Sequence, residues 1–212
     1  MTASKKPLFI TLEGWEGAGK STAMKYLQQQ LCQLNVDVLT TREPGGTLIA
    51  EQIREILLKK QTEPLTAATE LLLVFAGRSQ HIANVIRPAL AKGQWVVCDR
   101  FTDASFAYQG GGRGVSWPMI ESLEQFVQQG LQPDVTILLD APPHLGLKRI
   151  SRRAELDRIE AEKIDFFKRV REAYLQRAKQ DPKRFVIIDT SKPLATVKRR
   201  LLELAKKWVS AA

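Results

Sequence analysis

The 212-residue chain has little of several features that would assign it to a class. Its two cysteines, Cys32 and Cys98, belong to no spaced set, so we expect neither a disulfide framework nor a cysteine-based metal site. Apolar runs such as residues 71–76 stop far short of the ~20 residues that a membrane span needs. The first residues lack the apolar core of a signal peptide. We therefore expect a cytoplasmic protein with no membrane partner.

Linkers, repeats and low-complexity stretches are also lacking, so we expect residues 1–212 to form a single domain. The net charge of +9 indicates either a nucleic-acid partner or a site that collects phosphates. The basic residues of 198–207 alternate with apolar residues at helical spacing, which favours a solvated helix face over a nucleic-acid arm. Those of 149–158 lack an apolar stripe, and either a solvated loop or a mobile basic flap fits them.

Short, apolar, β-branched runs alternate with helical patterns along the chain. The runs have the near-continuous apolar character of strands buried on both faces, and the alternation predicts a doubly wound α/β fold with a five-stranded parallel sheet. In such sheets ligands bind beyond the carboxyl ends of the strands. We expect strands at residues 8–12, 36–40, 95–98, 135–139 and 185–188, and helices at 21–34, 47–59, 66–92 with a break near Pro88, 117–129, 142–153, 160–180 and 194–208.

A glycine-rich loop stands between the first expected strand and the first expected helix. Its glycines let backbone N–H groups meet phosphate oxygens at the positive end of the helix. Lys20 would then add a charge at the β- and γ-phosphates, and the Ser21 hydroxyl would bind magnesium. A plain glycine-rich turn is the alternative. The pattern predicts a site for ATP and Mg²⁺ formed by Gly14, Trp15, Glu16, Gly17, Ala18, Gly19, Lys20 and Ser21.

Polar residues follow later strands as well. Asp99 suits a magnesium ion or a phosphate acceptor, unless it caps a turn. Arg100 beside it suits a second anion, because a guanidinium can grip a phosphate in two places. Arg78, in an apolar helix, either meets a ligand carbonyl or reaches solvent. Gln109 either lies in a flexible turn or offers a donor and an acceptor to a base edge. Two phosphate sites imply transfer between them.

Six segments, in chain order, resemble bacterial thymidylate kinase: residues 14–21 (GWEGAGKS), 41–46 (TREPGG), 75–78 (FAGR), 98–101 (CDRF), 107–114 (AYQGGGRG) and 156–160 (LDRIE). The match runs from about residue 8 to about residue 185. The resemblance implies a P-loop nucleoside monophosphate kinase that transfers the ATP γ-phosphate to dTMP for dTTP synthesis, with Mg²⁺, as a homodimer. It further implies a base and sugar site formed by Glu43, Arg54, Arg78, Ser105 and Gln109, with the monophosphate at Arg100.

Two parts of this resemblance concern positions where the family varies. Many members stack an aromatic ring on thymine where this chain has Val74, and we expect the neighbouring Phe75 to take that place. One branch carries a catalytic arginine in the phosphate loop, whereas the other supplies it from a mobile lid, here at about 149–160. Because the loop has no arginine, the lid branch fits, with Arg153 on the γ-phosphate and Arg152 as the alternative. The implied catalytic set is Lys20, Asp99, Arg100 and Arg153.

Two other functions stay open from the sequence. A phosphate loop with an Asp-Arg pair would also serve a kinase for another monophosphate or nucleoside. A non-catalytic nucleotide switch or a nucleic-acid-binding module would explain the loop and the net charge. We expect the kinase, with dTMP and ATP as its partners and no nucleic acid.

Overall fold

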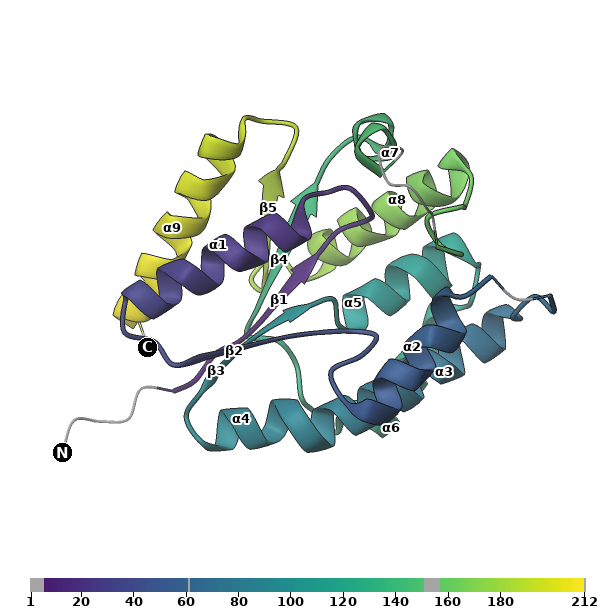
Figure 1. Ribbon diagram of the computed structural model, residues 1–212, viewed down its shortest axis with the longest axis horizontal. Coiled ribbons are helices and arrows are strands. Elements are labelled where there is room, and N and C mark those ends of the chain that lie inside the picture. The colour runs from purple at the N-terminus through teal and green to yellow at the C-terminus, as the bar shows by residue number, and fades with distance from the viewer. Residues whose placement is uncertain (1–5, 61, 151–156, 212) are drawn as a thin grey trace.

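A sheet of five parallel strands, in the order β2-β3-β1-β4-β5, forms the centre of the molecule (Figure 1). The computed structural model describes residues 6–60, 62–150 and 157–211. The expectation of a doubly wound α/β fold with five parallel strands is confirmed. The strands are β1 (Phe9–Glu13), β2 (Val38–Arg42), β3 (Trp95–Asp99), β4 (Val135–Asp140) and β5 (Phe185–Asp189).

Helices connect successive strands and cover both faces of the sheet (Figure 1). They are α1 (Lys20–Gln33), α2 (Leu48–Leu58), α3 (Ala67–His81), η1 (Ile82–Ile86), α4 (Arg87–Ala91), α5 (Thr102–Ser105), η2 (Phe106–Gly112), α6 (Trp117–Gln128), α7 (Pro143–Ile150), α8 (Ile164–Gln180) and α9 (Leu194–Ala211). On one face, α1 and α9 bury residues such as Leu27 and Leu201 against β1 and β4. On the other, η1 and α4 pack on β1 and β3 through residues such as Ile86.

The two edge strands differ from the three central ones in burial. All five residues of β1 are buried, whereas every residue of β2 is partly or fully exposed, and in β5 only Phe185 and Ile188 are buried. The expectation that all five strands are buried on both faces is therefore wrong for β2 and β5. An edge strand has a neighbour on one side only, and the covering helices reach it less completely.

Two segments are more helical than the sequence indicates. Where a break near Pro88 was expected, the π-helical turn η1 joins α3 to α4 without interruption, and Pro88 follows that turn in α4. Of residues 108–114, for which a flexible turn was one interpretation, the first five belong to the π-helical turn η2, which follows α5 directly. Wide π turns re-aim side chains and are frequent at functional sites.

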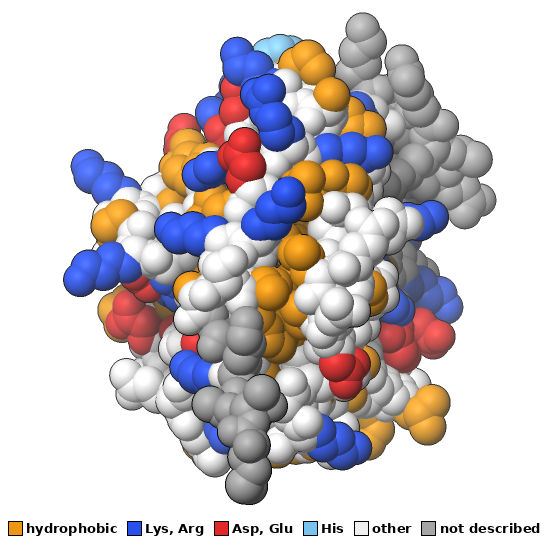
Figure 2. Space-filling model, turned by 90° about the vertical axis from the view of Figure 1, so that its left-hand side faces the viewer, with side chains coloured by type: hydrophobic (Ala, Val, Ile, Leu, Met, Phe, Trp, Pro, Cys, Tyr) orange, Lys and Arg blue, Asp and Glu red, His pale blue; other side chains and the backbone are white. Residues whose placement is uncertain are grey.

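The basic residues of the C-terminal helix lie on its solvent side. In α9 the buried positions are apolar, such as Leu201 and Trp208, while Arg199, Lys206 and Lys207 are exposed. The expectation of a solvated helix face is confirmed. Figure 2 shows the side of the molecule that lies on the left in Figure 1, where Lys and Arg side chains are interspersed with hydrophobic and acidic ones. Within the described residues, no helix is both long and apolar enough to cross a membrane.

Candidate active site

The glycine-rich loop leaves β1 and enters α1 through left-handed backbone conformations. Gly14, Gly17 and Gly19 have φ angles of +135°, +77° and +95°, which strain any residue with a Cβ. A Cβ on Gly17 would also lie 2.5 Å from the carbonyl oxygen of Gly146 in α7. The loop therefore needs glycine both for its turns and for its close approach to α7, and it presents the free N–H groups at the start of α1 to the surface.

Lys20 folds back onto this loop. Its Nζ donates to the carbonyl oxygens of Gly14 at 2.9 Å and Trp15 at 3.4 Å. Burial lowers the pKa of Lys20 to about 8, and the nearby Arg100 adds to the effect, while Asp99 and Glu16 oppose it. A phosphate would restore the charge that burial disfavours, so the lysine is placed to gain from an anion at the loop.

The side chain of Trp15 is part of the structure of the loop. It is 1% exposed, its Nε1 donates to the carbonyl oxygen of Ala141 at 3.0 Å, and its ring lies 5.6 Å from that of Phe167. A Cβ on Gly146 would overlap the indole. The ring thus fills the space between the loop and α7, which explains a bulky residue at this position.

Asp99 and Ser21 line one cleft together with Lys20 and Arg100, and we call it the loop cleft. Oδ1 of Asp99 is buried and has no hydrogen-bond partner in the described part of the chain, while Ser21 is exposed at the start of α1. Carboxylate and hydroxyl oxygens are the ligand types that Mg²⁺ takes from proteins alongside water and phosphate. An unpartnered carboxylate oxygen beside a hydroxyl therefore fits a magnesium ion. No group of three or more His, Cys, Asp or Glu side chains around a common point occurs among the described residues.

Arg100 follows Asp99 in a left-handed conformation, with φ of +71°, which is uncommon for a residue with a side chain. Its Nη2 donates to Oε1 of Glu16 at 2.6 Å and its Nη1 to the carbonyl oxygen of Gly14 at 3.3 Å. The other carboxylate oxygen of Glu16 accepts from the Tyr108 hydroxyl at 2.5 Å. The turn thus aims the guanidinium at the phosphate loop, where it meets the same carbonyl as Lys20.

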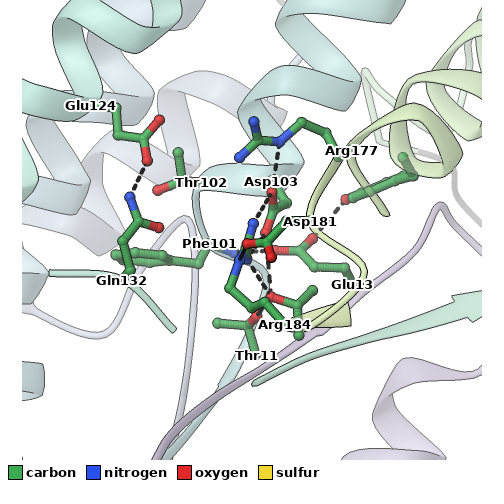
Figure 3. A network of polar contacts seen from close by, with 12 residues as sticks. Thr11, Glu13, Phe101, Thr102, Asp103, Glu124, Gln132, Arg177, Asp181 and Arg184 are labelled. Carbon is green, nitrogen blue, oxygen red and sulfur yellow. Dashed lines mark hydrogen bonds and ion pairs between the residues drawn. The ribbon is translucent and has the colours of Figure 1, made fainter. Parts of the chain in front are cut away.

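The buried carboxylate of Glu13 holds the backbone next to this turn. Glu13 accepts from the Phe101 N–H at 2.7 Å and from the Tyr174 hydroxyl at 2.8 Å. Burial raises the pKa of Glu13 to about 8, and the charge of Asp103 contributes. Burial alone would raise the pKa of Asp103 too, but hydrogen bonds and charge from Arg184 and Arg177 lower it (Figure 3). Side chains from β1, α5, α8 and the loop before β5 therefore hold the Arg100 turn in place.

A second cavity, which we call the inner cavity, adjoins the loop cleft. The two share Glu16, Glu43, Arg54 and Arg100. Arg54 also donates from Nη1 to the carbonyl oxygen of Pro44 at 2.9 Å. The rest of the inner cavity has both apolar and polar walls. The apolar residues are Leu57, Val74 and Phe101, and the polar ones are Arg78, Ser105 and Gln109.

Arg78 is the most buried cation at the inner cavity, only 2% exposed, so it does not reach solvent. Its Nε pairs with Oε2 of Glu43 at 2.7 Å, and its Nη2 donates to Ser105 Oγ at 3.0 Å and to the Phe101 carbonyl at 3.1 Å. Its Nη1 is buried with no hydrogen-bond partner in the part of the chain that the structure describes. An unpaired guanidinium N–H on a cavity residue suits a carbonyl acceptor of a ligand.

Glu43 has a further partner that the sequence did not point to. His81 Nδ1 lies 3.0 Å from Glu43 Oε1, and the other ring nitrogen lies 2.7 Å from Thr41 Oγ1. Glu70 was missed as well: it is 1% exposed and accepts from Gln109 Nε2 at 2.8 Å. A signal was present, because Glu70, Val74 and Arg78 are spaced by four in a helical pattern and so share one face.

Most of the expected site residues line the loop cleft or the inner cavity. Phe75 is an exception: it packs in the core with Leu71 and Phe106, below the Arg78 guanidinium at 4.5 Å, and Val74 lines the cavity in its place. Phe75 is thus not among the residues that line the inner cavity, because adjacent helix positions point about 100° apart, and its contact with the base stays a prediction. Arg152 and Arg153 lie outside the described residues, and their roles stay predictions.

Known proteins with similar sequences agree on one family. The family model described as Thymidylate kinase matches residues 12–201. The chain belongs to the thymidylate kinase family. It is 59% identical to the thymidylate kinase of Pseudomonas savastanoi pv. phaseolicola over 92% of each chain. To that of Pseudomonas putida strain W619 it is 56% identical, over 92% of this chain and 94% of the relative. The crystal structure of thymidylate kinase from Ehrlichia chaffeensis is similar, with a TM-score of 0.75, 32% identity and coverage of 93% and 98%.

Membership in the thymidylate kinase family decides between the functions that the sequence left open. It makes the chain an ATP-dependent nucleoside monophosphate kinase, which is a phosphotransferase. A non-catalytic nucleotide switch is therefore set aside. Described residues from each of the six segments that carried the resemblance lie at the loop cleft, at the inner cavity or in the helices behind them.

Proposed function

We propose that the protein transfers the γ-phosphate of ATP to dTMP, releasing ADP and dTDP for dTTP synthesis. One observation carries this proposal: Lys20 and Arg100 donate to the same carbonyl oxygen, that of Gly14. The side chain expected at the donor phosphates and the one expected at the acceptor phosphate thus meet at one point. Because the loop cleft and the inner cavity share residues there, ATP in the first and dTMP in the second would face each other across a short gap.

The inner cavity supports thymine as the base. Arg78 Nη1 offers a buried N–H that a carbonyl such as O4 of thymine would accept, whereas cytosine carries an amino donor at that position. Val74 and Leu57 supply apolar contacts for the ring and its methyl group. A site with a buried donor rejects a ligand that cannot accept from it, since the donor is then left unpaired.

Transfer would begin with an exchange of partners at Arg100. The acceptor phosphate displaces Glu16 and takes the guanidinium, while Tyr108 keeps a hydrogen bond with the freed carboxylate. An oxygen of dTMP then attacks the γ-phosphorus in line, and the bond from that phosphorus to the bridging oxygen of ADP breaks. The protein forms no covalent bond in this step. It positions the two nucleotides and neutralises the charge on the phosphates.

Ser21 and Asp99 would hold Mg²⁺, which supplies charge neutralisation at the donor phosphates when bound. Lys20 and the loop N–H groups hold the same phosphates from the protein side. We further propose Arg153 as the lid arginine that reaches the γ-phosphate, on the family resemblance. The Arg153→Ala enzyme should then lose kcat with little change in dTMP affinity, as measured by initial rates and calorimetry.

The decisive experiment is an acceptor panel. With ATP and Mg²⁺, coupled ADP release should give a higher kcat/KM for dTMP than for dUMP, dCMP or AMP. A larger kcat/KM for another monophosphate would refute dTMP as the substrate while leaving the kinase intact. A lack of turnover with every acceptor would refute the transfer itself.

We also propose that the protein is a homodimer formed through α2, α3 and α6. Helix α3 packs against both α2 and α6, and the outer sides of these helices expose Leu48, Leu72, Met119 and Phe126 at 54–88%. Large apolar side chains gathered on adjacent helices typically mark an interface. Light scattering should give twice the chain mass, and Leu72→Glu should give the monomer; a monomeric wild type would refute the proposal.

The cytoplasm is the location that we propose for the enzyme. Its substrates ATP and dTMP are cytoplasmic nucleotides, and the two free cysteines need no oxidising compartment. Cell fractionation with an antibody should recover the protein with the cytosolic fraction, and recovery with membranes would refute this location.

A further inference from the structure

Glu70 is a buried carboxylate at the inner cavity to which the transfer mechanism gives no role. It lies on α3, 1% exposed, and accepts from Gln109 Nε2 at 2.8 Å. Two arginines hold its other oxygen: Arg158 Nη1 at 2.7 Å and Arg113 Nε at 3.2 Å. Arg113 is held in turn by Glu162 at 2.5 Å. The carboxylate is therefore fixed on three sides: by Gln109 of η2, by Arg113 just after η2, and by Arg158.

These contacts decide which way the amide of Gln109 points. A carboxylate between two guanidinium groups accepts hydrogen bonds and donates none. The Gln109 amide must therefore turn its NH₂ group toward Glu70, and its carbonyl oxygen becomes the end left for a ligand. This argument rests on the chemistry of the partner, so it holds even though the oxygen and nitrogen of an amide look alike in a structure.

We propose that Glu70 is a specificity-determining positioning residue that makes the inner cavity select a pyrimidine with an N–H at N3. The inference rests on the proposed function, because it places the base in the cavity beside Gln109. Thymine has a donor at N3 and cytosine an acceptor. With its carbonyl oxygen presented, Gln109 pairs with the first and opposes the second, which adds a second test of the base to the one made by Arg78.

Replacing the carboxylate by an amide of the same shape should reverse this preference. In Glu70→Gln, the single remaining oxygen is drawn to Arg158, which makes the shortest contact in the cluster. The new NH₂ group then faces Gln109, and the Gln109 amide turns its oxygen toward it. Gln109 now presents its own NH₂ group to the base, where N3 of cytosine accepts from it and N3–H of thymine does not.

The experiment compares two substrates in two enzymes. The kcat/KM ratio of dTMP to 5-methyl-dCMP is measured for wild type and for Glu70→Gln; both bases carry the methyl group, and Arg78 is the same in both enzymes. We expect the ratio to fall by about tenfold or more in the variant, which is the usual size of one hydrogen bond to a buried partner. A smaller fall overturns the proposal.

Controls separate positioning from a general loss of structure. Glu162→Gln loses the outer ion pair with Arg113 but does not touch Gln109, so its ratio should equal that of wild type. If Glu70→Gln fails to fold, Gln109→Met leaves Glu70 paired with both arginines and removes the amide that Glu70 orients; its ratio should also fall, and an unchanged ratio there overturns the proposal. A wild type that does not phosphorylate dTMP would refute the proposed function instead, so the two failures are distinct.

Discussion

The two ends of the site are built by opposite means. At the loop cleft the phosphate loop is one continuous segment, residues 13–21, which offers backbone N–H groups and holds Lys20 on the carbonyl of Gly14, and Asp99 and Arg100 join it from the end of β3. Among the described residues, the inner cavity is lined by six separate segments, tied by buried ion pairs such as Arg78–Glu43 and Arg158–Glu70. The difference teaches that a phosphate can be bound by local geometry, whereas a base needs long-range pairs.

A consequence is that mutations at the two ends should fail in different ways. Lys20 of the phosphate loop makes no ion pair with any described residue, and its own hydrogen bonds go to backbone carbonyls, so its loss should lower activity while folding survives. A residue of the inner cavity usually holds a second buried charge, so stability should fall first.

The largest effect should come from breaking the inner cavity with Arg78→Met. Glu43, whose side chain is 4% exposed, would be left buried without its guanidinium, and the free energy of unfolding should drop by about 3–5 kcal/mol. Urea unfolding followed by circular dichroism measures this loss. As a matched control, Arg200→Met removes an exposed pair with Glu203 and should cost less than about 1 kcal/mol. Equal losses in the two variants would contradict the comparison.

Lys20→Met should break the other end with an effect on turnover alone. Without the ammonium group at the donor phosphates, kcat should fall by about 10²–10³. Stability should not fall, because burial disfavours the charged lysine and lowers its pKa to about 8. Initial rates and urea unfolding test these two expectations, with the exposed Lys25→Met on the same helix as control. A destabilised Lys20→Met protein would show that the loop also depends on buried charge.

The last prediction concerns how steeply stability depends on pH, and it sharpens the comparison at Glu13, behind the Arg100 turn where the two ends of the site meet. The pKa of Glu13 is raised from 4.5 to about 8, chiefly by burial and then by Asp103, while Tyr174, Arg100 and the Phe101 N–H act the other way. The folded protein then binds a proton that the unfolded chain releases above pH 4.5. Stability from this group is full below pH 4.5 and is lost as the pH rises to about 8.

Glu13→Gln keeps the neutral form at every pH, so its stability should be similar to that of wild type near pH 4.5 and should decline less toward pH 8. Melting temperatures at pH 5, 6, 7 and 8 measure both slopes. Glu172→Gln, on the exposed side of α8, should keep the wild-type slope. Parallel slopes for Glu13→Gln and wild type would rule out a buried neutral Glu13.

The local half of this site could be predicted from the residues themselves, whereas the lining of the other half was expected only from the family resemblance, without Glu70 or the buried pairings. The loop, its flanking strand and helix, and the Asp99–Arg100 pair could be predicted because each lies in one short segment with a physical signature. The Glu43–Arg78–His81 and Glu70–Gln109 contacts join residues 35 to 39 positions apart, and nothing local announces such pairing. The sequence suggested Phe75 at the base, but Val74 lines the cavity, because neighbouring residues of a helix face different sides.

The indole of Trp15 gives the molecule an optical property of its own. Of the four tryptophans, Trp15 alone sits in the phosphate loop, with its ring sealed from water and its N–H fixed on Ala141. Any rearrangement of the loop around a bound nucleotide changes the surroundings of that ring, and with them its emission. The tryptophan fluorescence of the unlabelled protein should therefore change when a nucleotide binds in the loop.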